Sequence, residues 1–258
     1  MQTVVNSIRE RVLNREILSG TFLNLGSNIT VEIAGRSGLD WLLIDTEHGA
    51  GDHETLVHQL QAAGATPAAP IVRIAFNETP RFKRALDLGA SGIMVPWVSS
   101  VEEAQQAVAA MQFPPRGVRG VAKFNRASGF GADFEDYFEH AHEQLTGVIQ
   151  IERKEAVDCI EDIAAVPGVD VLFVGPLDLS VSLGIREQFD DPAFIEARDK
   201  VAQAAKAAGK AAGILLWNAD RLEEYISAGY TFIAVGSDGG AVGLGMKTFA
   251  SAFDRFRG

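Results

Sequence analysis

The sequence has little of what marks several protein classes. It holds one cysteine among 258 residues, so it cannot form an internal disulfide. That residue, Cys159, stands in a predicted helix, where we expect a small buried side chain rather than a catalytic thiol. No apolar run is long enough to span a membrane, and residues 1–7 lack the basic region and apolar core of a signal peptide. These absences predict a cytoplasmic protein.

Positive charge is also scarce. The chain has 23 Lys and Arg residues against 34 Asp and Glu residues, which gives a formal net charge of -11. Without a basic stripe, this balance argues against nucleic-acid binding and against anionic membrane surfaces. No lysine lies inside a predicted apolar strand, which disfavours a Schiff-base aldolase. No Gly-x-Ser-x-Gly elbow of a serine hydrolase is present either.

What the chain does contain is an alternation of apolar strands and amphipathic helices from end to end. Glycine recurs where a helix is expected to end before a strand begins, which is typical of a left-handed C-cap. These glycines are Gly38, Gly89, Gly168 and Gly229. The predicted strands are 21–26, 41–45, 69–74, 92–96, 147–152, 170–174, 211–216 and 231–236. The predicted helices include 52–63, 78–88, 101–110, 193–208 and 220–228, with Asp220 and Ser99 or Ser100 as N-caps.

Eight strands joined by right-handed crossovers predict a TIM (β/α)8 barrel, and residues 1–258 suit one such domain. An open doubly wound sheet is the alternative, but no Gly-x-Gly-x-x-Gly follows the first strand. The connection from about Phe113 to Thr146 is expected to be long and irregular, as in a lid or an oligomer contact. Gly236–Gly245 is expected to be a loop at the end of the barrel that often binds phosphate.

Three short segments stand where a barrel places its catalytic groups. They are Asp45–Gly49, Gln150–Glu152 and Gly175–Ser180, and each follows or closes an apolar strand. In a barrel, the carboxyl ends of the strands meet at one mouth, so these segments should lie together. A carboxylate at the end of a buried strand is costly unless a metal, a cation or a substrate balances it.

Glu152 and Asp178 follow consecutive predicted strands, so their carboxylates are expected to converge. Two bare carboxylates repel each other, and a divalent cation would resolve that conflict. Ligation by a few oxygen atoms suits Mg²⁺ or Mn²⁺. The alternative is that one or both carboxylates cap a helix or pair with Arg153 or Lys154 at the surface.

Two further side chains at the predicted mouth can carry chemistry. Arg73 ends the third strand, where it can clamp a carboxylate or stabilise a developing oxyanion, although a structural ion pair is an equal alternative. His48 follows the second strand and is a natural general acid or base. The neighbouring Asp45 and Glu47 could fix its tautomer and raise its basicity.

Together, the motifs Asp-x-Glu-His, Gln-x-Glu and Gly-Pro-x-Asp-Leu-Ser resemble the metal-dependent class II pyruvate aldolases. That family includes 4-hydroxy-2-oxoheptanedioate aldolase and 2-dehydro-3-deoxyglucarate aldolase, and the resemblance covers nearly the whole chain. It implies a β/α barrel that forms a hexamer, a trimer of dimers, with a C-terminal helix exchanged between subunits. Phe249, Phe253 and Phe256 are spaced to share one face of such a helix.

The resemblance also assigns roles to individual residues. Glu152 and Asp178 would bind the divalent metal, which is Mg²⁺ or Mn²⁺, with Co²⁺ as a further candidate. His48 would be the base, oriented by Asp45 and made more basic by Asp87. Arg73 would stabilise the enolate. The substrate would contact Arg73, Gln150, Gly175, Pro176, Leu177 and Asp178.

This chain departs from the family at Leu177, where relatives commonly have alanine or serine, and at Phe22, where some have tryptophan. Lys123–Arg126 is also unusual. These departures leave the natural substrate open.

The implied reaction is the reversible cleavage of a 4-hydroxy-2-oxo acid to pyruvate, or hydroxypyruvate, and an aldehyde through a metal-stabilised enolate. The nearest alternative is a lyase that acts on an acyl-CoA of the malyl- or citryl-CoA type, with Arg116–Arg126 as the only dense basic segment for the CoA phosphates. A second alternative is an isomerase or synthase that binds a phosphorylated sugar through the Gly-rich segment and needs no metal. A non-catalytic scaffold would leave the convergence of His48, Arg73, Glu152 and Asp178 unexplained.

Overall fold

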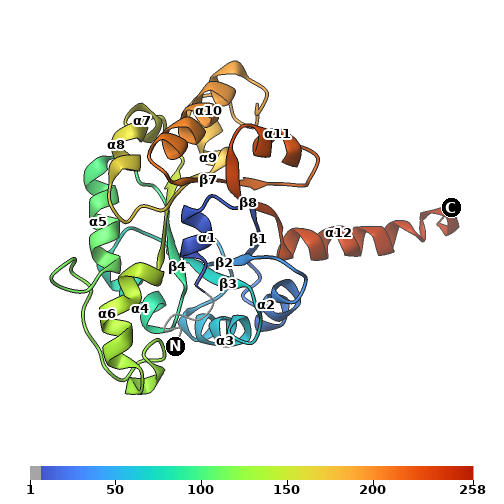
Figure 1. The fold of residues 1–258 in the computed structure, drawn as a ribbon. Coiled ribbons are helices and arrows are strands. Elements are labelled where there is room, and N and C mark those ends of the chain that lie inside the picture. The colour runs from blue at the N-terminus through green and yellow to red at the C-terminus, as the bar shows by residue number, and fades with distance from the viewer. Residues whose placement is uncertain (1–6, 258) are drawn as a thin grey trace.

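The computed structural model describes residues 7–257, in which eight parallel strands form a closed barrel (Figure 1). Each strand pairs with the next along the chain, and β8 pairs with β1 to close the sheet. The predicted TIM (β/α)8 barrel is therefore confirmed. The strands are β1 Leu18–Leu23, β2 Trp41–Asp45, β3 Ala69–Arg73, β4 Gly92–Val95, β5 Thr146–Ile151, β6 Val171–Val174, β7 Ala211–Leu216 and β8 Tyr230–Ser237.

Helices surround the barrel, and one of them, α12, projects away from it (Figure 1). Among the described residues, no helix is both long enough and apolar enough to cross a membrane. The α-helices are α1 Arg9–Leu13, α2 Asn28–Gly35, α3 His53–Ala63, α4 Thr79–Asp87, α5 Val101–Met111, α6 Phe134–Gln144, α7 Lys154–Asp158, α8 Ile160–Ala165, α9 Pro176–Ser182, α10 Pro192–Ala207, α11 Leu222–Ser227 and α12 Asp238–Ser251. Two short 3₁₀ helices are η1 Gly129–Gly131 and η2 Asp254–Phe256.

Strand residues alternate between the inside of the barrel and the layer beneath the helices, because successive side chains point to opposite faces of a sheet. Large rings fill the inside. The Trp41 and Phe232 rings stack with centroids 4.0 Å apart, and Phe173 meets Trp41 edge-on at 6.2 Å. All three are fully buried. The interior is therefore a packed core that supports the mouth above it, not a pore.

The first strand begins earlier than its pattern predicts, at Leu18 rather than residue 21. Gly20 obscured this start, because glycine is a poor strand former. In the barrel, Gly20 pairs with Trp41, and a Cβ atom at Gly20 would lie 2.2 Å from the Trp41 ring. Glycine is required there by a residue 21 positions away, which no local pattern reveals.

The predicted Gly-rich loop is wrong, because α12 begins at Asp238 within it. Ser237 caps this helix by accepting a hydrogen bond from the Gly240 N–H at 3.1 Å. The helix ends at Ser251, so of the three phenylalanines only Phe249 lies in it.

Three smaller expectations also need correction. The connection from 113 to 146 contains α6, whose Tyr137 and Ala141 are buried. Cys159 lies between α7 and α8 and is only half-buried. Asp220 does not cap α11, which follows Arg221 without a side-chain cap, whereas Ser100 does cap α5.

Candidate active site

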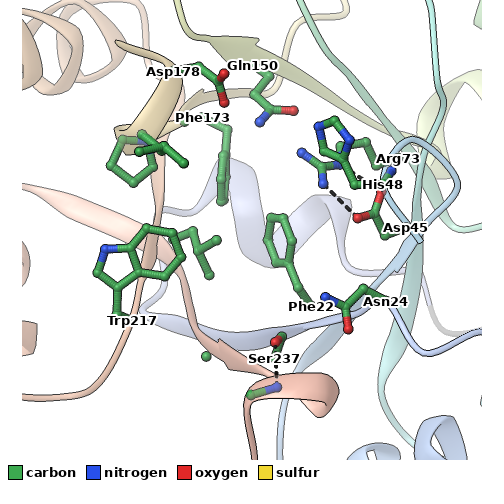
Figure 2. A pocket seen from close by; sticks show the side chains of 16 residues that line it. Phe22, Asn24, Asp45, His48, Arg73, Gln150, Phe173, Asp178, Trp217 and Ser237 are labelled. Atoms are coloured by element: carbon green, nitrogen blue, oxygen red, sulfur yellow. Dashed lines mark hydrogen bonds and ion pairs between the residues drawn. The ribbon is translucent and has the colours of Figure 1, made fainter. Parts of the chain in front are cut away.

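Asp45, His48, Arg73, Gln150 and Asp178 line one cavity of about 400 Å³ at the carboxyl mouth of the barrel, and Glu152 lies beside it, hydrogen-bonded to Gln150. Figure 2 shows His48 and Arg73 on one side of this cavity, with Gln150 and Asp178 beside one another. Asp45 and Arg73 are the last residues of β2 and β3, Gln150 lies on β5, and Asp178 lies in the first turn of α9. A cavity of this size is typical of a small-molecule site.

Arg73 is held by two buried carboxylates. Its Nε donates to Asp45 Oδ1 at 3.0 Å, its Nη2 donates to Asp45 Oδ2 at 2.7 Å, and its Nη1 lies 3.2 Å from Glu47 Oε2. Two of the five N–H donors of the guanidinium are hydrogen-bonded to Asp45, which leaves donors for a ligand. The arginine is therefore both an ion-pair partner and a preorganised anion clamp.

These contacts move the pKa values of both carboxyl groups. Burial acts to raise the pKa of Asp45, but the hydrogen bonds and charge of Arg73 outweigh it and lower that pKa. Burial raises the pKa of Glu47, the nearby charge of Asp45 adds to the rise, and Arg73 and His48 oppose it. Asp45 is thus the permanent counter-charge of Arg73, and Glu47 is a weaker acid beside it.

The loop after β2 positions His48. Asp45 Oδ1 accepts hydrogen bonds from the backbone N–H groups of Glu47 at 3.0 Å and His48 at 3.2 Å. Gly49 completes the loop, since a Cβ there would lie 2.0 Å from the Asp45 carbonyl oxygen. Asp45 thus contacts the histidine backbone, while the carboxylate nearest the ring is Glu47, whose Oε1 lies 3.9 Å from His48 Nε2.

Glu152 lies just past the end of β5 and is only 2 % exposed. Its Oε1 accepts a hydrogen bond from the Gln150 amide, and its Oε2 accepts one from the Trp97 N–H at 3.1 Å. Trp97 adopts φ 60°, a strained backbone for an aromatic residue, and such strain often accompanies a functional site. Gly175 passes close by, and a Cβ there would lie 2.6 Å from Glu152 Oε1.

The donor set fits a divalent cation. Burial raises the pKa of Glu152 to about 8, and the charges of Asp178 and Glu47 add to the rise. A cation between Glu152 and Asp178 would hold Glu152 ionised and remove the repulsion. Gln150 Oε1 is buried without a hydrogen-bond partner, which is a further unsatisfied oxygen at this place.

Only two protein carboxylates contribute to this arrangement. Within residues 7–257, no group of three or more His, Cys, Asp and Glu side chains is placed to hold a metal ion. A site with two protein ligands suits an ion that keeps several positions for water or substrate, as Mg²⁺ does.

Asp87 is the predicted site residue that lies apart from this arrangement, whereas Glu152, which does not itself line the cavity, is hydrogen-bonded to Gln150, which does. It ends α4, at the opposite end of the barrel from the mouth, and its carboxylate pairs with Arg119 Nη2 at 2.8 Å. Helices of a barrel run back along the strands, so a residue at the end of α4 lies near the start of β4. Within one chain Asp87 is therefore placed with Arg119 and not at the cavity, and its expected effect on the basicity of His48 stays a prediction.

The cavity also has residues that the sequence motifs missed. They are Asn24, Phe173, Leu215 and Trp217, while Gly236, Ser237 and Gly240, from the Gly-rich segment named above, line it as well. Asn24 and Trp217 each stand just after a strand, so applying the strand-end rule to every strand would have found them. Phe173 points inward from the middle of β6, and its fully buried apolar side chain offers no such signal.

Comparison with known proteins supports an enzyme with this geometry. The family model for HpcH/HpaI aldolase/citrate lyase matches residues 18–243. The chain is 38% identical over 250 residues to a 5-keto-4-deoxy-D-glucarate aldolase of Enterobacter sp. (strain 638), covering 97% of both chains. It is 41% identical over 220 residues to a hydroxypyruvate/pyruvate aldolase of Agrobacterium fabrum, covering 85% of this chain and 82% of the relative.

A solved structure agrees with these matches. The crystal structure of an HpcH/HpaI aldolase/citrate lyase family protein from Burkholderia cenocepacia J2315 superposes with a TM-score of 0.90 at 38% identity, covering 98% of this chain and all of that one. The extent of the match includes the barrel and every strand end that lines the cavity. The chain belongs to the HpcH/HpaI aldolase/citrate lyase family.

Proposed function

We propose that the protein catalyses the reversible cleavage of 4-hydroxy-2-oxo acids to pyruvate, or hydroxypyruvate, and an aldehyde. The observation that carries this proposal is that an anion clamp, a histidine and Asp178 line one cavity, with Glu152 beside Gln150 at its edge, so that the two carboxylates suit a cation. The relatives named as aldolases support the same reaction type.

Cleavage needs a base, an electron sink and charge stabilisation. His48 takes the proton of the C4 hydroxyl group, and the O–H electron pair becomes the new aldehyde C=O bond. The C3–C4 bond breaks, and its electrons form the enolate of pyruvate across C2 and C3. Protonation at C3 then releases pyruvate, so atoms and charge balance, and synthesis runs the same steps in reverse.

Arg73 and Gln150 hold the 2-oxo acid. The N–H donors of Arg73 that do not bond to Asp45 stabilise the negative charge that grows on the enolate oxygen, and Asp45 keeps the guanidinium in place. The backbone of Gly175, Pro176 and Leu177 borders the substrate end of the cavity. A divalent cation held by Glu152 and Asp178, Mg²⁺ or Mn²⁺ with Co²⁺ as a further candidate, would supply Lewis-acid stabilisation of the same oxygen.

The structure weakens the alternative functions. In the segment Arg116–Arg126, Arg119 is fully buried against Asp87, and Arg126 donates to the backbone carbonyls of Leu88 and Leu60. These arginines have structural partners and do not line the cavity, which disfavours CoA phosphates. The Gly-rich segment forms the start of α12 and carries Asp238 in its first turn, a charge that opposes phosphate.

Assembly as a homo-oligomer is part of the proposal. The helix α12 carries four exposed apolar side chains, Val242, Leu244, Met246 and Phe249, on a segment that projects from the barrel (Figure 1). Apolar patches of this kind mark protein interfaces. The hexamer with an exchanged helix that the family resemblance implies would cover them.

Substitution of the carboxylates tests the function. Glu152→Ala and Asp178→Ala should each weaken Mn²⁺ binding and abolish pyruvate release from a 4-hydroxy-2-oxo acid. Glu155→Ala, an exposed carboxylate on α7, serves as the matched control and should change neither. Wild-type turnover in either site variant would contradict the assignment of these residues.

A further inference from the structure

The cavity has two chemically different walls. One carries the polar groups that act on the 2-oxo acid, and Figure 2 shows Trp217 facing them across the cavity, with Phe22 and Phe173 between. The second wall is apolar. Its members come from β1, β6, α9 and the end of β7, and they are Phe22, Phe173, Leu177, Leu215 and Trp217.

Two members of this apolar wall are open to a ligand. Trp217 is 58% exposed and Leu177 is 36% exposed. Phe22, in contrast, is 5% exposed, and its ring centroid lies 5.2 Å from Cζ of Arg73. Large apolar side chains left open at a ligand cavity gain free energy when an apolar group covers them. The exposed pair is therefore a surface that can accept part of a substrate.

The apolar wall continues beyond the catalytic cavity. A second hollow of about 230 Å³ shares Pro176, Leu215 and Trp217 with the first. Trp217 thus lines both of these adjoining cavities. A substrate that extends past the reacting carbons meets the indole ring first and then a further hollow. Phe189, Leu216 and Tyr225 line this hollow together with Asn218, Asp220 and Arg221.

The charged residues that line the cavity also favour an apolar substituent on the substrate. Among the described residues that line it, Arg73 is the only lysine or arginine, and the proposed reaction assigns it to the 2-oxo acid. Asp45 is paired with Arg73, and Asp178 is assigned to the metal ion, so neither supplies positive charge at the far end of the cavity. In the adjoining hollow Arg221 is already paired with Asp190 and Glu224, and Asp220 adds a negative charge. A second carboxylate at the far end of a substrate would therefore find no cation that lacks a carboxylate partner among the described residues lining the two spaces.

From these observations we infer that the acceptor subsite takes an aldehyde with an apolar, branched or aromatic substituent, and that Trp217 and Leu177 determine this specificity. The inference rests on the proposed aldolase function and names its substrate class. The inferred specificity differs from that of an aldolase whose acceptor aldehyde ends in a carboxylate.

Two aldehydes of nearly equal shape test this inference. In 4-methylpentanal two methyl groups stand where 4-oxobutanoate has its carboxylate oxygens, so the pair differs in charge and polarity alone. In addition of pyruvate by the metal-loaded enzyme, kcat/KM should favour 4-methylpentanal by about tenfold or more. Trp217→Ser and Leu177→Ser should each reduce this preference severalfold. Trp217→Arg, which adds the missing cation, should shift it toward 4-oxobutanoate.

A control variant and a second assay separate the possible failures. Phe124→Ser replaces a 79% exposed aromatic residue remote from the cavity and should leave the preference unchanged. Exchange of the pyruvate methyl protons in D₂O, followed by NMR, reports enolate formation without any aldehyde. Two results would overturn the inference while leaving the proposed function intact. In both, the methyl protons of pyruvate exchange. In the first, the enzyme prefers 4-oxobutanoate, and in the second, neither serine variant alters its preference between the two aldehydes. Absence of both exchange and aldol addition would overturn the proposed function and the inference with it.

Discussion

An alanine at position 175 would place a methyl group where the Glu152 side chain already lies. The added Cβ would be 2.6 Å from Glu152 Oε1, 2.7 Å from its Cγ and 3.1 Å from Gln150 Nε2. Ordinary contacts begin near 3.4 Å, so the glutamate must move by about 0.8 Å (3.4 minus 2.6). Gly175 has φ -88° and ψ 96°, which alanine adopts without strain, so the effect comes from this contact alone.

We expect Gly175→Ala to lower the rate of pyruvate release by about 100-fold, because a shift of about 1 Å in a positioned catalytic group has that effect. Overpacking should cost about 1–3 kcal/mol of unfolding free energy, which leaves the barrel folded. Turnover, Mn²⁺ affinity and urea denaturation measure the three consequences.

The matched control is Gly120→Ala. Its added Cβ would meet only Lys83 at 3.4 Å, an ordinary contact with a flexible side chain, so activity and metal affinity should not change. If Gly175→Ala retained wild-type turnover and Mn²⁺ affinity, the argument that Glu152 must occupy its present position would be refuted.

Three further predictions concern the base, the clamp and the surface. His48→Ala should lower the aldol rate by about 10²–10⁴-fold while Mn²⁺ affinity stays nearly intact, and loss of metal would make His48 a ligand instead. Arg73→Lys loses the paired donation to Asp45, so turnover should fall by at least about tenfold, and an unchanged rate would exclude clamping. Hydrogen bonds from Arg221, followed by those from Arg198, lower the pKa of Glu224 to about 2 from 4.5. A carboxylate with a depressed folded-state pKa stabilises the fold above the unfolded value and loses that effect as pH falls from about 4.5 to 2. The stability difference between wild type and Glu224→Gln, measured by urea denaturation, should therefore shrink from pH 7 to pH 3. It should stay below about 1 kcal/mol, since Glu224 is partly exposed, and a difference that grew on acidification would contradict this pairing.

The barrel could be predicted because its signal is periodic and local. The strands 41–45 and 211–216 were located to the residue. The helix-ending glycines Gly38, Gly89, Gly168 and Gly229 all have positive φ, as a left-handed C-cap requires. These features depend on residues that are neighbours in the chain, so a single sequence carries them.

Features that depend on distant residues were missed or misplaced. The start of β1 depends on the contact of Gly20 with Trp41, and the glycines of α12 hid a helix that Ser237 caps. The role of Asp87 rests on a motif alone, and within one chain its position at the end of α4 places it with Arg119. Barrel topology brings the ends of all strands to one mouth, so Arg73 and Gln150 line one cavity although they are far apart in the chain.

The central claim is that a divalent cation and these strand-end residues together cleave 4-hydroxy-2-oxo acids. The most direct test measures pyruvate release by enzyme stripped with EDTA, before and after addition of Mg²⁺ or Mn²⁺. The account predicts release only after metal is restored. Release at the full rate by stripped enzyme would contradict the role given to Glu152 and Asp178. No release with any metal from folded protein would contradict the proposed reaction itself.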